Sequence, residues 1–314
     1  SAARAALEVD RHWSSEGFRD DAQAAEYRER ARTWVADYVE RHGVDGAPEP
    51  MGEVVGLERW LSAPVGAMVA EGRADRAVNI AGGLHHAMAD HAWGFCVYND
   101  CAVAISWLLD HGCERVAYVD IDVHHGDGVE QAFWDDPSVL TISLHQDGYY
   151  PHESGYADER GEGAGHGANI NVPLPPGTGT GGYEYAFDEV VVPALERFRP
   201  EFVFVASGFD SSALDPLGRQ MLHSEGFRRL TRRMLDVAAS TAGGRLLGVH
   251  EGGYSAGYVP FCGLAVLEEL SGIRTEADDP FLDFLSAMAG QDLAPHQKDV
   301  VDGLVPLVSE VPAP

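Results

Sequence analysis

The sequence predicts an α/β protein, with a mainly parallel central sheet and helices on both of its faces. From residue 76 onward, short apolar segments of strand character alternate with longer helical segments, as they do when parallel strands are joined by helical crossovers. Polar clusters follow four of the short segments, and the ligands of such sheets bind at the carboxyl ends of the strands. We find no internal repeat and no linker, so a single domain over residues 1–314 is expected.

The expected elements follow in chain order. Apolar residues recur at helical spacing from Asp20 to Glu40, a Pro/Gly-rich loop fills residues 46–52, and residues 53–71 have the character of a further helix. Strands are predicted at 76–80, 115–121, 138–144, 201–207 and 245–249. Helices are predicted at 99–109, 127–134, 182–198, 224–240 and from about 259, with a Gly-rich loop at 155–167.

The composition excludes several classes of protein. Asp and Glu number 50 against 22 Lys and Arg, and the resulting net charge of -28 repels phosphate backbones, so no direct nucleic-acid partner is expected. The same charge favours a cationic substrate, although solubility explains it equally well. The four cysteines have no C-x-x-C spacing, which is typical of reduced thiols. Without a secretory h-region or an apolar run of bilayer length, we expect a cytoplasmic protein with no membrane contact.

The segment 118–128 carries the strongest functional signal. Alternation along an extended chain places Asp120, Asp122 and His124 on one face, directly after a strand. Asp127 follows three residues later, and the side chain of His125 points off the ligand face. Carboxylate oxygen and imidazole nitrogen without a thiolate suit zinc or ferrous iron. The alternative is an ordinary turn cluster, because Asp and Gly are common after strands.

A catalytic zinc usually has three protein ligands and one open position, so a third ligand is needed. The loop after the strand at 201–207 offers two candidates, Asp210 and Asp215. We favour Asp215, because the proline that follows holds it in an extended conformation. Asp210 fits the capping of a helix or turn better. Such a site would lower the pKa of a bound water and would favour hydrolysis.

Acid–base groups are available at the same edge of the predicted sheet. His85 and His86 follow a Gly-Gly pair, and Asp120 and Asp127 are carboxylates that could fix their tautomers. Tyr254 also follows two glycines, and its phenol could donate a hydrogen bond to a carbonyl oxygen. Taken singly, each of these residues also fits a structural histidine or an ordinary turn.

Together these motifs resemble a known family. G-G-L-H-H-A at 82–87, G-F-C-V-Y-N-D at 94–100, Y-V-D-I-D-V-H-H-G-D-G at 118–128 and E-G-G-Y at 251–254 are similar to motifs of the zinc-dependent histone deacetylase superfamily. That superfamily includes bacterial and archaeal acetoin-utilisation-type proteins and histone-deacetylase-like amidohydrolases. The resemblance runs from about residue 60 to about 275, and it implies the single-domain arginase/deacetylase-like fold.

The resemblance also implies a role for each matching residue. It makes His86 the general base and then the general acid, paired with Asp127, while His85 is an electrostatic partner paired with Asp120, and Tyr254 polarises the amide carbonyl. The implied zinc ligands are Asp122, His124 and Asp215. The implied tunnel residues are Gly94, Phe95 and Tyr150, with Leu222 at the rim position seven residues after the last zinc ligand. A structural K⁺ or Na⁺ is implied at Asp120, Asp122, His124, Ser143 and Leu144.

The resemblance predicts removal of acetyl or short acyl groups from the ε-amino group of a lysine peptide or a similar small amine, with Zn²⁺ or Fe²⁺ as the metal. Acetylpolyamines and acylated metabolites are alternative substrates, and Leu222 stands where polyamine-selective members carry an acid. An arginase-like enzyme with two manganese ions and a silent acyl-lysine reader are the more distant alternatives. The family's first strand and its H-P-E-x-P-x-R-like segment have no match in residues 1–50. A homo-oligomer is left open.

Overall fold

The computed structural model describes residues 62–314 together with Ala25 and Glu29. Ala25 and Glu29 are helical, and the rest of the helix expected between Asp20 and Glu40 lies outside the described residues. So do the loop at 46–52 and the beginning of the helix at 53–71. The rest of that last segment is helix α3 (Ser62–Ala70).

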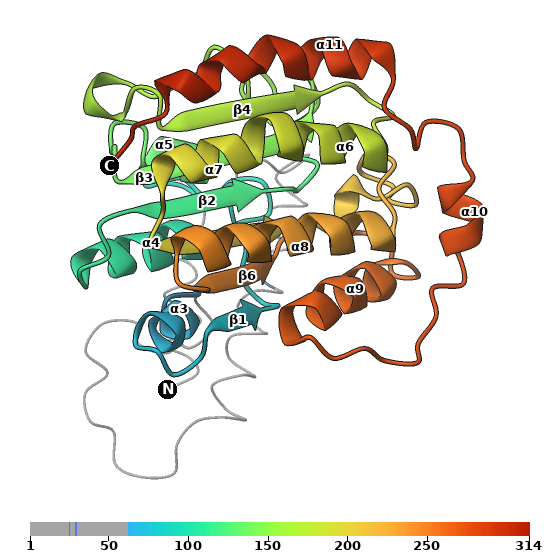
Figure 1. The fold of residues 1–314 in the computed structure, drawn as a ribbon, viewed down its shortest axis with the longest axis horizontal. Coiled ribbons are helices and arrows are strands. Elements are labelled where there is room, and N and C mark those ends of the chain that lie inside the picture. The colour runs from blue at the N-terminus through green and yellow to red at the C-terminus, as the bar shows by residue number, and fades with distance from the viewer. Residues whose placement is uncertain (1–24, 26–28, 30–61) are drawn as a thin grey trace.

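The centre of the fold is a six-stranded sheet in the order β1-β6-β5-β2-β3-β4, and every neighbouring pair is parallel (Figure 1). This confirms the predicted parallel α/β class. The strands are β1 (Arg76–Asn79), β2 (Val116–Asp120), β3 (Val139–Gln146), β4 (Asn169–Leu174), β5 (Phe202–Ser207) and β6 (Leu246–His250).

Strand β4 was not predicted, because its sequence N-I-N-V-P-L contains two asparagines and a proline. In the sheet order β4 is an edge strand, where a missing N–H is tolerated. The asparagine side chains are buried and bonded: Asn169 Nδ2 and Asn171 Nδ2 donate to Glu130 Oε2 at 2.6 and 2.8 Å. Tertiary contacts thus override the low strand propensity of this segment.

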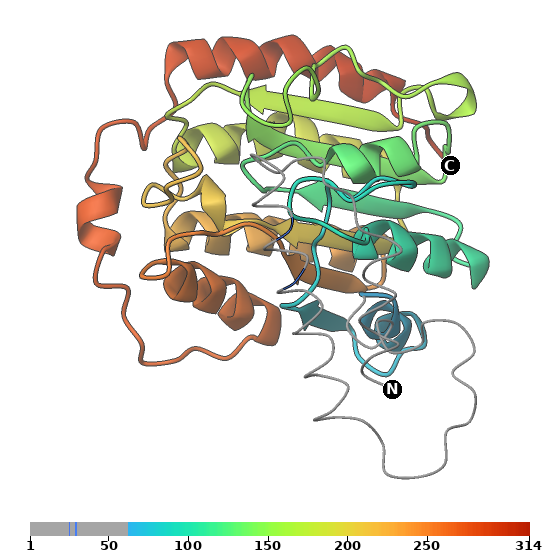
Figure 2. The same cartoon turned by 180° about the vertical axis from the view of Figure 1, so that it is seen from behind.

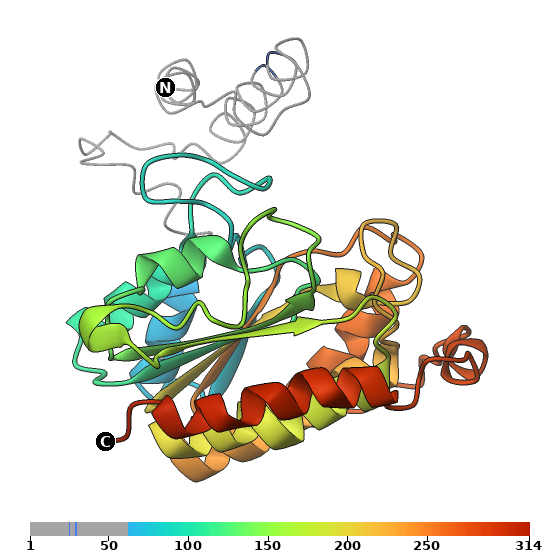
Figure 3. The same cartoon turned by 90° about the horizontal axis from the view of Figure 1, so that it is seen from above.

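Helices cover both faces of the sheet, as Figure 3 shows with the sheet seen near edge-on. One layer, visible in front of the sheet in Figure 2, consists of α3, α4 (Asp100–Asp110) and α5 (Asp127–Ala132). The opposite layer consists of α6 (Thr180–Ala186), the π-helical η2 (Phe187–Val191), α7 (Val192–Phe198), α8 (Ser224–Thr241), α9 (Val259–Ser271) and α11 (Pro295–Leu304).

The remaining elements are short. They are the 3-10 helices η1 (Gly163–Gly165), η3 (Phe209–Ser211) and η4 (Val305–Glu310), and helix α10 (Leu282–Ser286), which stands apart from the sheet in Figure 1. Among residues 62–314, no helix combines the length and the apolar character needed to cross a membrane.

Alternation along β2 shows how the two layers are joined to the sheet. Ala117 and Val119 are buried in the core formed with α6, η2, α7 and α8, whereas Val116 and Tyr118 are buried in the core formed with α3 and α4. A strand buried on both faces reads as a continuous apolar run, which is typical of parallel sheets. Asp120 is the first carboxylate on this strand, and it is fully buried.

The order of the strands explains where the site forms. Strands β1, β6, β5 and β2 are consecutive in the sheet and parallel, so their carboxyl ends share one edge. The four polar clusters of the sequence follow these four strands. The prediction that they meet at one edge is confirmed.

Candidate active site

The loop that carries the two adjacent histidines is fixed by side chains at the start of α4. The carboxylate of Asp100 accepts hydrogen bonds from the backbone N–H groups of Gly83 and Leu84, at 3.0 and 2.8 Å. Asn99 Nδ2 donates to the backbone carbonyls of His85 and Ala87 at 3.3 and 3.1 Å. These bonds satisfy the backbone of a buried loop, and they hold the histidines in place.

Each histidine is paired with one carboxylate, as predicted. His85 Nδ1 lies 2.7 Å from Asp120 Oδ2, and His86 Nδ1 lies 2.7 Å from Asp127 Oδ1. The two Nε2 atoms face each other at 3.0 Å. Burial opposes the charge of His85, but Asp120 and Glu251 outweigh it and raise its pKa. Burial and the neighbouring His85 lower the pKa of His86 to about 4, so its imidazole is neutral near pH 7.

Three further groups converge on one point, namely Asp122, His124 and Asp210. His124 Nδ1 lies 3.0 Å from both Asp122 Oδ1 and Asp210 Oδ2, and all three residues are buried. The three ligand atoms lie close enough to hold one metal ion. Burial opposes a charged His124, but the two carboxylates outweigh it and raise its pKa to about 10. Burial and the charge of Asp122 raise the pKa of Asp210 to about 7.

The prediction of Asp215 as the third ligand is corrected by this geometry. Its carboxylate accepts hydrogen bonds from the backbone N–H groups of Leu217 (2.8 Å), Tyr254 (2.6 Å) and Ser255 (3.2 Å). The 3-10 turn η3 follows β5 immediately and turns Asp210 toward His124. Five residues later, Asp215 serves the backbone of the loop that carries Tyr254.

The rim position assigned to Leu222 also changes. Leu222 is completely buried in the core, so it does not lie on the rim. Counted from Asp210 in place of Asp215, the position seven residues later is Leu217, whose side chain is 38% exposed. That position is therefore also occupied by a leucine, five residues earlier in the chain than Leu222.

The predicted tunnel residues fall into two groups. The ring of Tyr150 stands edge-on to His86, with 5.3 Å between ring centroids, and a Cβ on Gly94 would overlap the His86 ring. Phe95 is 80% exposed and has a left-handed φ of 67°, and no ring contact with Tyr150 is recorded among the described residues. Trp93 instead stacks on Tyr150, with centroids 6.2 Å apart and an interplanar angle of 17°.

The E-G-G-Y loop needs its glycines because it crosses directly over the carboxylates of Asp122 and Asp210. Gly252 N donates to Asp122 Oδ2 at 2.8 Å, and a Cβ at this position would overlap Asp210 Oδ2. Gly253 has a φ of 148°, which favours glycine. Tyr254 follows, 39% exposed. Burial and the charges of Asp122, Glu251 and Asp210 raise its pKa, so the phenol keeps its proton.

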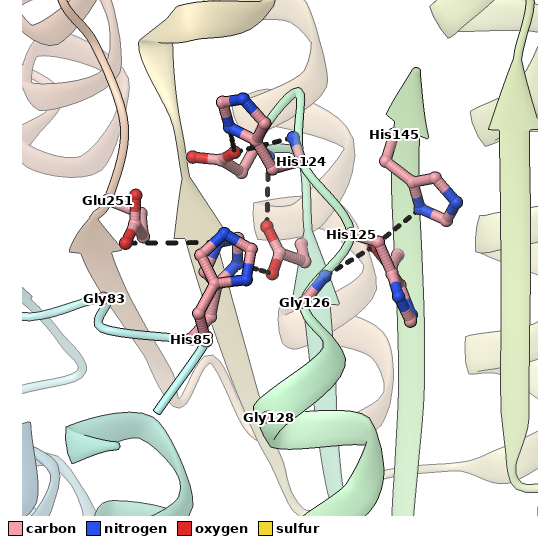
Figure 4. Close-up of polar contacts among 12 residues, drawn as sticks. Gly83, His85, His124, His125, Gly126, Gly128, His145 and Glu251 are labelled. Atoms are coloured by element: carbon pink, nitrogen blue, oxygen red, sulfur yellow. Dashed lines mark hydrogen bonds and ion pairs between the residues drawn. The ribbon is translucent and has the colours of Figure 1, made fainter. Parts of the chain in front are cut away.

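Glu251 is a residue of the site to which no role was assigned from the sequence. Its carboxylate, with the side chain 9% exposed, lies 4.0 Å from His85 Nε2 (Figure 4). It also accepts a hydrogen bond of 3.3 Å from Cys96 Sγ. Burial and the acids Asp122 and Asp210 raise its pKa to about 8, against the opposing effect of His85. The sequence feature that could have identified Glu251 is its position as the first residue of the E-G-G-Y motif, directly after the end of a predicted strand.

His125 and Ser143 lie beside these groups. His125 Nδ1 is 3.0 Å from Ser154 Oγ, and its Nε2 is 3.0 Å from Glu130 Oε2, so it faces away from His124 (Figure 4). This agrees with the prediction that its side chain points off the ligand face. Ser143 is the register partner of Asp120 on β3, and its Oγ lies 2.9 Å from His145 Nδ1.

The fold and this arrangement match one family. The model of the histone deacetylase domain matches residues 61–270, and the chain therefore belongs to the histone deacetylase family. It is 46% identical to the "Histone deacetylase-like amidohydrolase" of Pseudomonas aeruginosa over 268 residues, which cover 81% of this chain and 70% of that protein. It is 40% identical to the "Probable deacetylase" of Archaeoglobus fulgidus over 194 residues, 62% of this chain and 54% of that protein.

Among solved structures, the chain is similar to the HD domain of HDA15, with a TM-score of 0.68 and 33% sequence identity. The match covers 79% of this chain and 66% of that one. These relatives confirm the predicted superfamily and the α/β deacetylase fold, and they place the chain in a family of amide-hydrolysing enzymes. The chain spans about half to 70% of the curated relatives named here.

Proposed function

We propose that this protein is a metal-dependent amidohydrolase that removes acetyl or short acyl groups from the ε-amino nitrogen of lysine or a similar amine, with zinc as the metal. The observation that carries the proposal is the convergence of Asp122, His124 and Asp210 beside two histidine–carboxylate pairs. A catalytic metal with three ligands leaves room for substrate and water, and the paired histidines supply proton transfer.

The donor set supports a single divalent cation. Two carboxylate oxygens approach one imidazole nitrogen at 3.0 Å, and Asp210 Oδ2 is buried without a hydrogen bond of acceptable geometry. Oxygen and nitrogen ligands of this kind suit Zn²⁺ or Fe²⁺. When bound, the cation would polarise the amide carbonyl and lower the pKa of an adjacent water.

His86 is the general base of this proposal. Asp127 holds the proton on Nδ1, so the neutral ring presents the Nε2 lone pair. Nε2 takes a proton from water as the water oxygen attacks the carbonyl carbon. It returns a proton to the nitrogen as the C–N bond breaks and the bonding pair leaves with the amine. The phenol of Tyr254 donates a hydrogen bond to the carbonyl oxygen, which gains charge in the transition state.

A structural K⁺ or Na⁺ is proposed beside the metal. Asp120 and Ser143 are register partners on β2 and β3, and Leu144 follows on the same strand. Asp122 and His124 continue from the end of β2. Hard cations of this kind take oxygen ligands from carboxylates, hydroxyls and backbone carbonyls, all of which this corner of the sheet offers.

For the substrate, we propose a thin acyl-amine chain that passes Tyr150 and Trp93 and meets an apolar rim at Leu217. Leu217 carries no charge to attract a second ammonium group, which favours acylated lysine over acetylpolyamines. The acidic chain, with a net charge of -28, favours a peptide with further basic residues.

One observation favours a binuclear ureohydrolase as the second candidate. His85, Asp122 and Glu251 also lie close enough to hold a metal ion, and Asp122 would bridge the two sites. Against this, His85 Nδ1 is bonded to Asp120 and its Nε2 lies 3.0 Å from another imidazole. Two manganese ions per chain in purified protein would favour this candidate over the deacetylase.

The proposal is tested with His86→Ala and the control His111→Ala, an exposed histidine at the C-cap of α4. His86→Ala should keep its metal and lose at least about a hundredfold in kcat on an acetyl-lysine peptide, because general acid–base catalysis contributes roughly 10² to 10⁴. His111→Ala should match the wild type. A His86→Ala protein with near wild-type turnover would contradict the role of His86, and a wild type inactive on acylated lysines and acylated small amines would contradict the function.

A further inference from the structure

The loop that begins at Asp215 lies directly beside the groups of the site. The carboxylate of Asp215 accepts hydrogen bonds from the backbone N–H groups of Leu217 and Tyr254, so it joins this loop to the loop that carries the tyrosine. A Cβ on Gly218 would meet the backbone oxygen of Asp210 at 2.3 Å, so the loop also packs against η3. The loop is therefore held at the edge of the sheet where the site forms.

Arg219 continues this loop toward the segment that lines the proposed substrate path. Its backbone N–H donates to Gln146 Oε1 at 2.8 Å. Gln146 is the last residue of β3, and the segment that follows carries Tyr150, whose ring stands edge-on to His86. Arg219 thus lies between the loop of Tyr254 and the segment of Tyr150, and it is exposed.

The guanidinium of Arg219 has one nitrogen in use and one edge open. Nη1 donates to the backbone carbonyls of Gly218 and Pro216, at 2.9 and 3.5 Å, so the side chain folds back along its own loop. Nε and Nη2 form no hydrogen bond to the described residues. Arginine binds a carboxylate through two parallel N–H groups of this kind. Arg233 does so in this protein, with Nε and Nη2 at 2.7 and 3.0 Å from the two oxygens of Asp188.

The position of Arg219 sets it apart from the other arginines that form no ion pair within residues 62–314. Those others lie at, or shortly before, the first residue of a strand, and so at the opposite edge of the sheet: Arg76, Arg115, Arg197, Arg199 and Arg245. Arg219 lies at the edge formed by the carboxyl ends of the strands. In a chain with 50 Asp and Glu against 22 Lys and Arg, its charge is left available to an anionic group of the substrate.

An acylated lysine would bring such a group to this place. Its amide has to reach the acid–base groups, and its butyl chain passes Tyr150 and Trp93. The α-carbon then leaves the path where Leu217 and Arg219 lie. An α-carboxylate is attached directly to that carbon, so it stands at the rim in every acylated lysine whose carboxyl group is free.

We propose that Arg219 is a specificity-determining residue that binds the α-carboxylate of the acylated lysine. The preferred substrate is then an acylated lysine with a free carboxyl group, either as the amino acid or as the last residue of a peptide. The inference rests on the proposed function and names its substrate class. The net charge of -28 opposes an anionic group at long range, so the pair acts at contact distance, and basic residues earlier in a peptide remain compatible with it.

The test uses two substrates that differ only at this carboxyl group, namely Nα,Nε-diacetyl-lysine and its carboxamide. The wild type should have a kcat/KM about tenfold higher on the acid, as expected for a charge-assisted pair that is partly open to water. In Arg219→Gln, the ratio of the two kcat/KM values should fall to within about twofold of one. The loss should appear in KM for the acid and not in kcat, because the carboxylate is bound equally in the ground state and the transition state.

Two further variants separate this local pair from other effects. Arg219→Lys keeps the charge without the planar fork, so it should keep part of the preference for the acid. Arg76→Gln is the matched control, because it makes the same change of net charge at the opposite edge of the sheet, and it should keep the whole preference. If Arg76→Gln lost the preference as Arg219→Gln does, a long-range effect of charge would explain the result and the proposal would be overturned.

The remaining outcomes are also decisive. A wild type equally active on the acid and the carboxamide would overturn the proposal. So would an equal loss on both substrates in Arg219→Gln, since it would give Arg219 a structural role in its loop. A wild type that hydrolyses neither compound nor any other acylated amine would refute the proposed function itself, which is a different result from an active wild type without a preference.

A second pair of substrates tests which carboxylate is bound. In peptides with an internal acetyl-lysine, the residue that follows it is either aspartate or asparagine. The α-carboxylate assignment predicts that Arg219→Gln changes the ratio of kcat/KM for these two peptides less than twofold. If this ratio depends on Arg219 while the acid and the carboxamide are hydrolysed equally, Arg219 binds a neighbouring side chain and the assignment is wrong.

Discussion

The loop after β2 and the loop after β5 both bring carboxylates to His124, but they do so in different ways. After β2 the chain bends at residues 122–124, and Asp120, Asp122 and His124 reach the site from alternate positions of one short segment. After β5 the chain turns at once into η3, so only Asp210 faces His124. Asp215 lies beyond the turn and accepts backbone hydrogen bonds from the Tyr254 loop.

The difference separates two uses of a buried acid at a strand end. Asp122 and Asp210 point at one imidazole nitrogen and leave their charge to be compensated by a cation. Asp215 has its charge satisfied by three N–H groups and supports a loop. Distance in sequence from the metal-binding motif does not distinguish these uses, whereas the hydrogen-bond partners do.

The largest effect is expected from Asp210→Asn, which removes a ligand charge with little change of shape. Metal ligation supplies several kcal/mol of transition-state stabilisation, so kcat/KM should fall about a thousandfold or more. Steady-state hydrolysis of an acetyl-lysine peptide in the presence of added zinc measures this. If Asp210→Asn keeps activity within tenfold of the wild type, the assignment of Asp210 rather than Asp215 as the metal ligand is wrong.

A smaller effect is expected from the matched change Asp215→Asn. An amide oxygen can still accept some of the three N–H bonds, but the loop that presents Tyr254 becomes less well ordered. We expect kcat to fall about tenfold, in the range of other groups that orient a catalytic residue. The measurement is kcat on the same peptide at saturating zinc. A loss as large as that of Asp210→Asn would show that Asp215 binds the metal.

The sequence allowed the β2 loop to be predicted more fully than the β5 loop for a physical reason. Alternation along the chain predicted that Asp122 and His124 share a face, and their side chains do lie 3.0 Å apart although residues 122–124 form a bend. A turn has no such period, and the argument from Pro216 led to Asp215. Glu251 and Trp93 were missed as partners because their contacts, with His85 and Tyr150, join segments distant in sequence.

Other parts of the fold were predictable to different degrees. Five of the six strands read as apolar runs, and the four polar clusters predicted the functional edge of the sheet. Strand β4 was hidden by Asn169, Asn171 and Pro173, whose polarity is satisfied only by tertiary contacts with Glu130. Helices α10 and α11 were also not predicted, since no strand follows them to mark a crossover.

The smallest effect concerns β3, whose end supports the fold beside the site. His145 is buried, with Nδ1 2.9 Å from Ser143 Oγ and Nε2 2.9 Å from the Gly155 carbonyl. Burial and the nearby His125 lower its pKa to about 3. In the unfolded chain, the His145 side chain takes up a proton near pH 6.5, whereas in the folded protein it stays neutral. Its contribution to the unfolding free energy is therefore complete above about pH 6.5 and is lost as the pH falls below that value.

When the pH is lowered from 7.5 to 5, the titration of His145 in the unfolded state should reduce the unfolding free energy of the wild type by about 2 kcal/mol. In His145→Asn, that part of the pH dependence should be absent. Urea unfolding of both proteins at the two pH values measures it. Parallel pH dependence in the two proteins would show that His145 is not held neutral in the folded state.

The central claim is that one divalent cation binds to Asp122, His124 and Asp210 and not to Asp215. The most direct test is the zinc content of the wild type, Asp210→Asn and Asp215→Asn after zinc loading and removal of excess metal, measured by elemental analysis. We expect about one zinc per chain in the wild type and in Asp215→Asn, and well under half a zinc per chain in Asp210→Asn. The reverse order, with Asp210→Asn fully loaded and Asp215→Asn depleted, would contradict it.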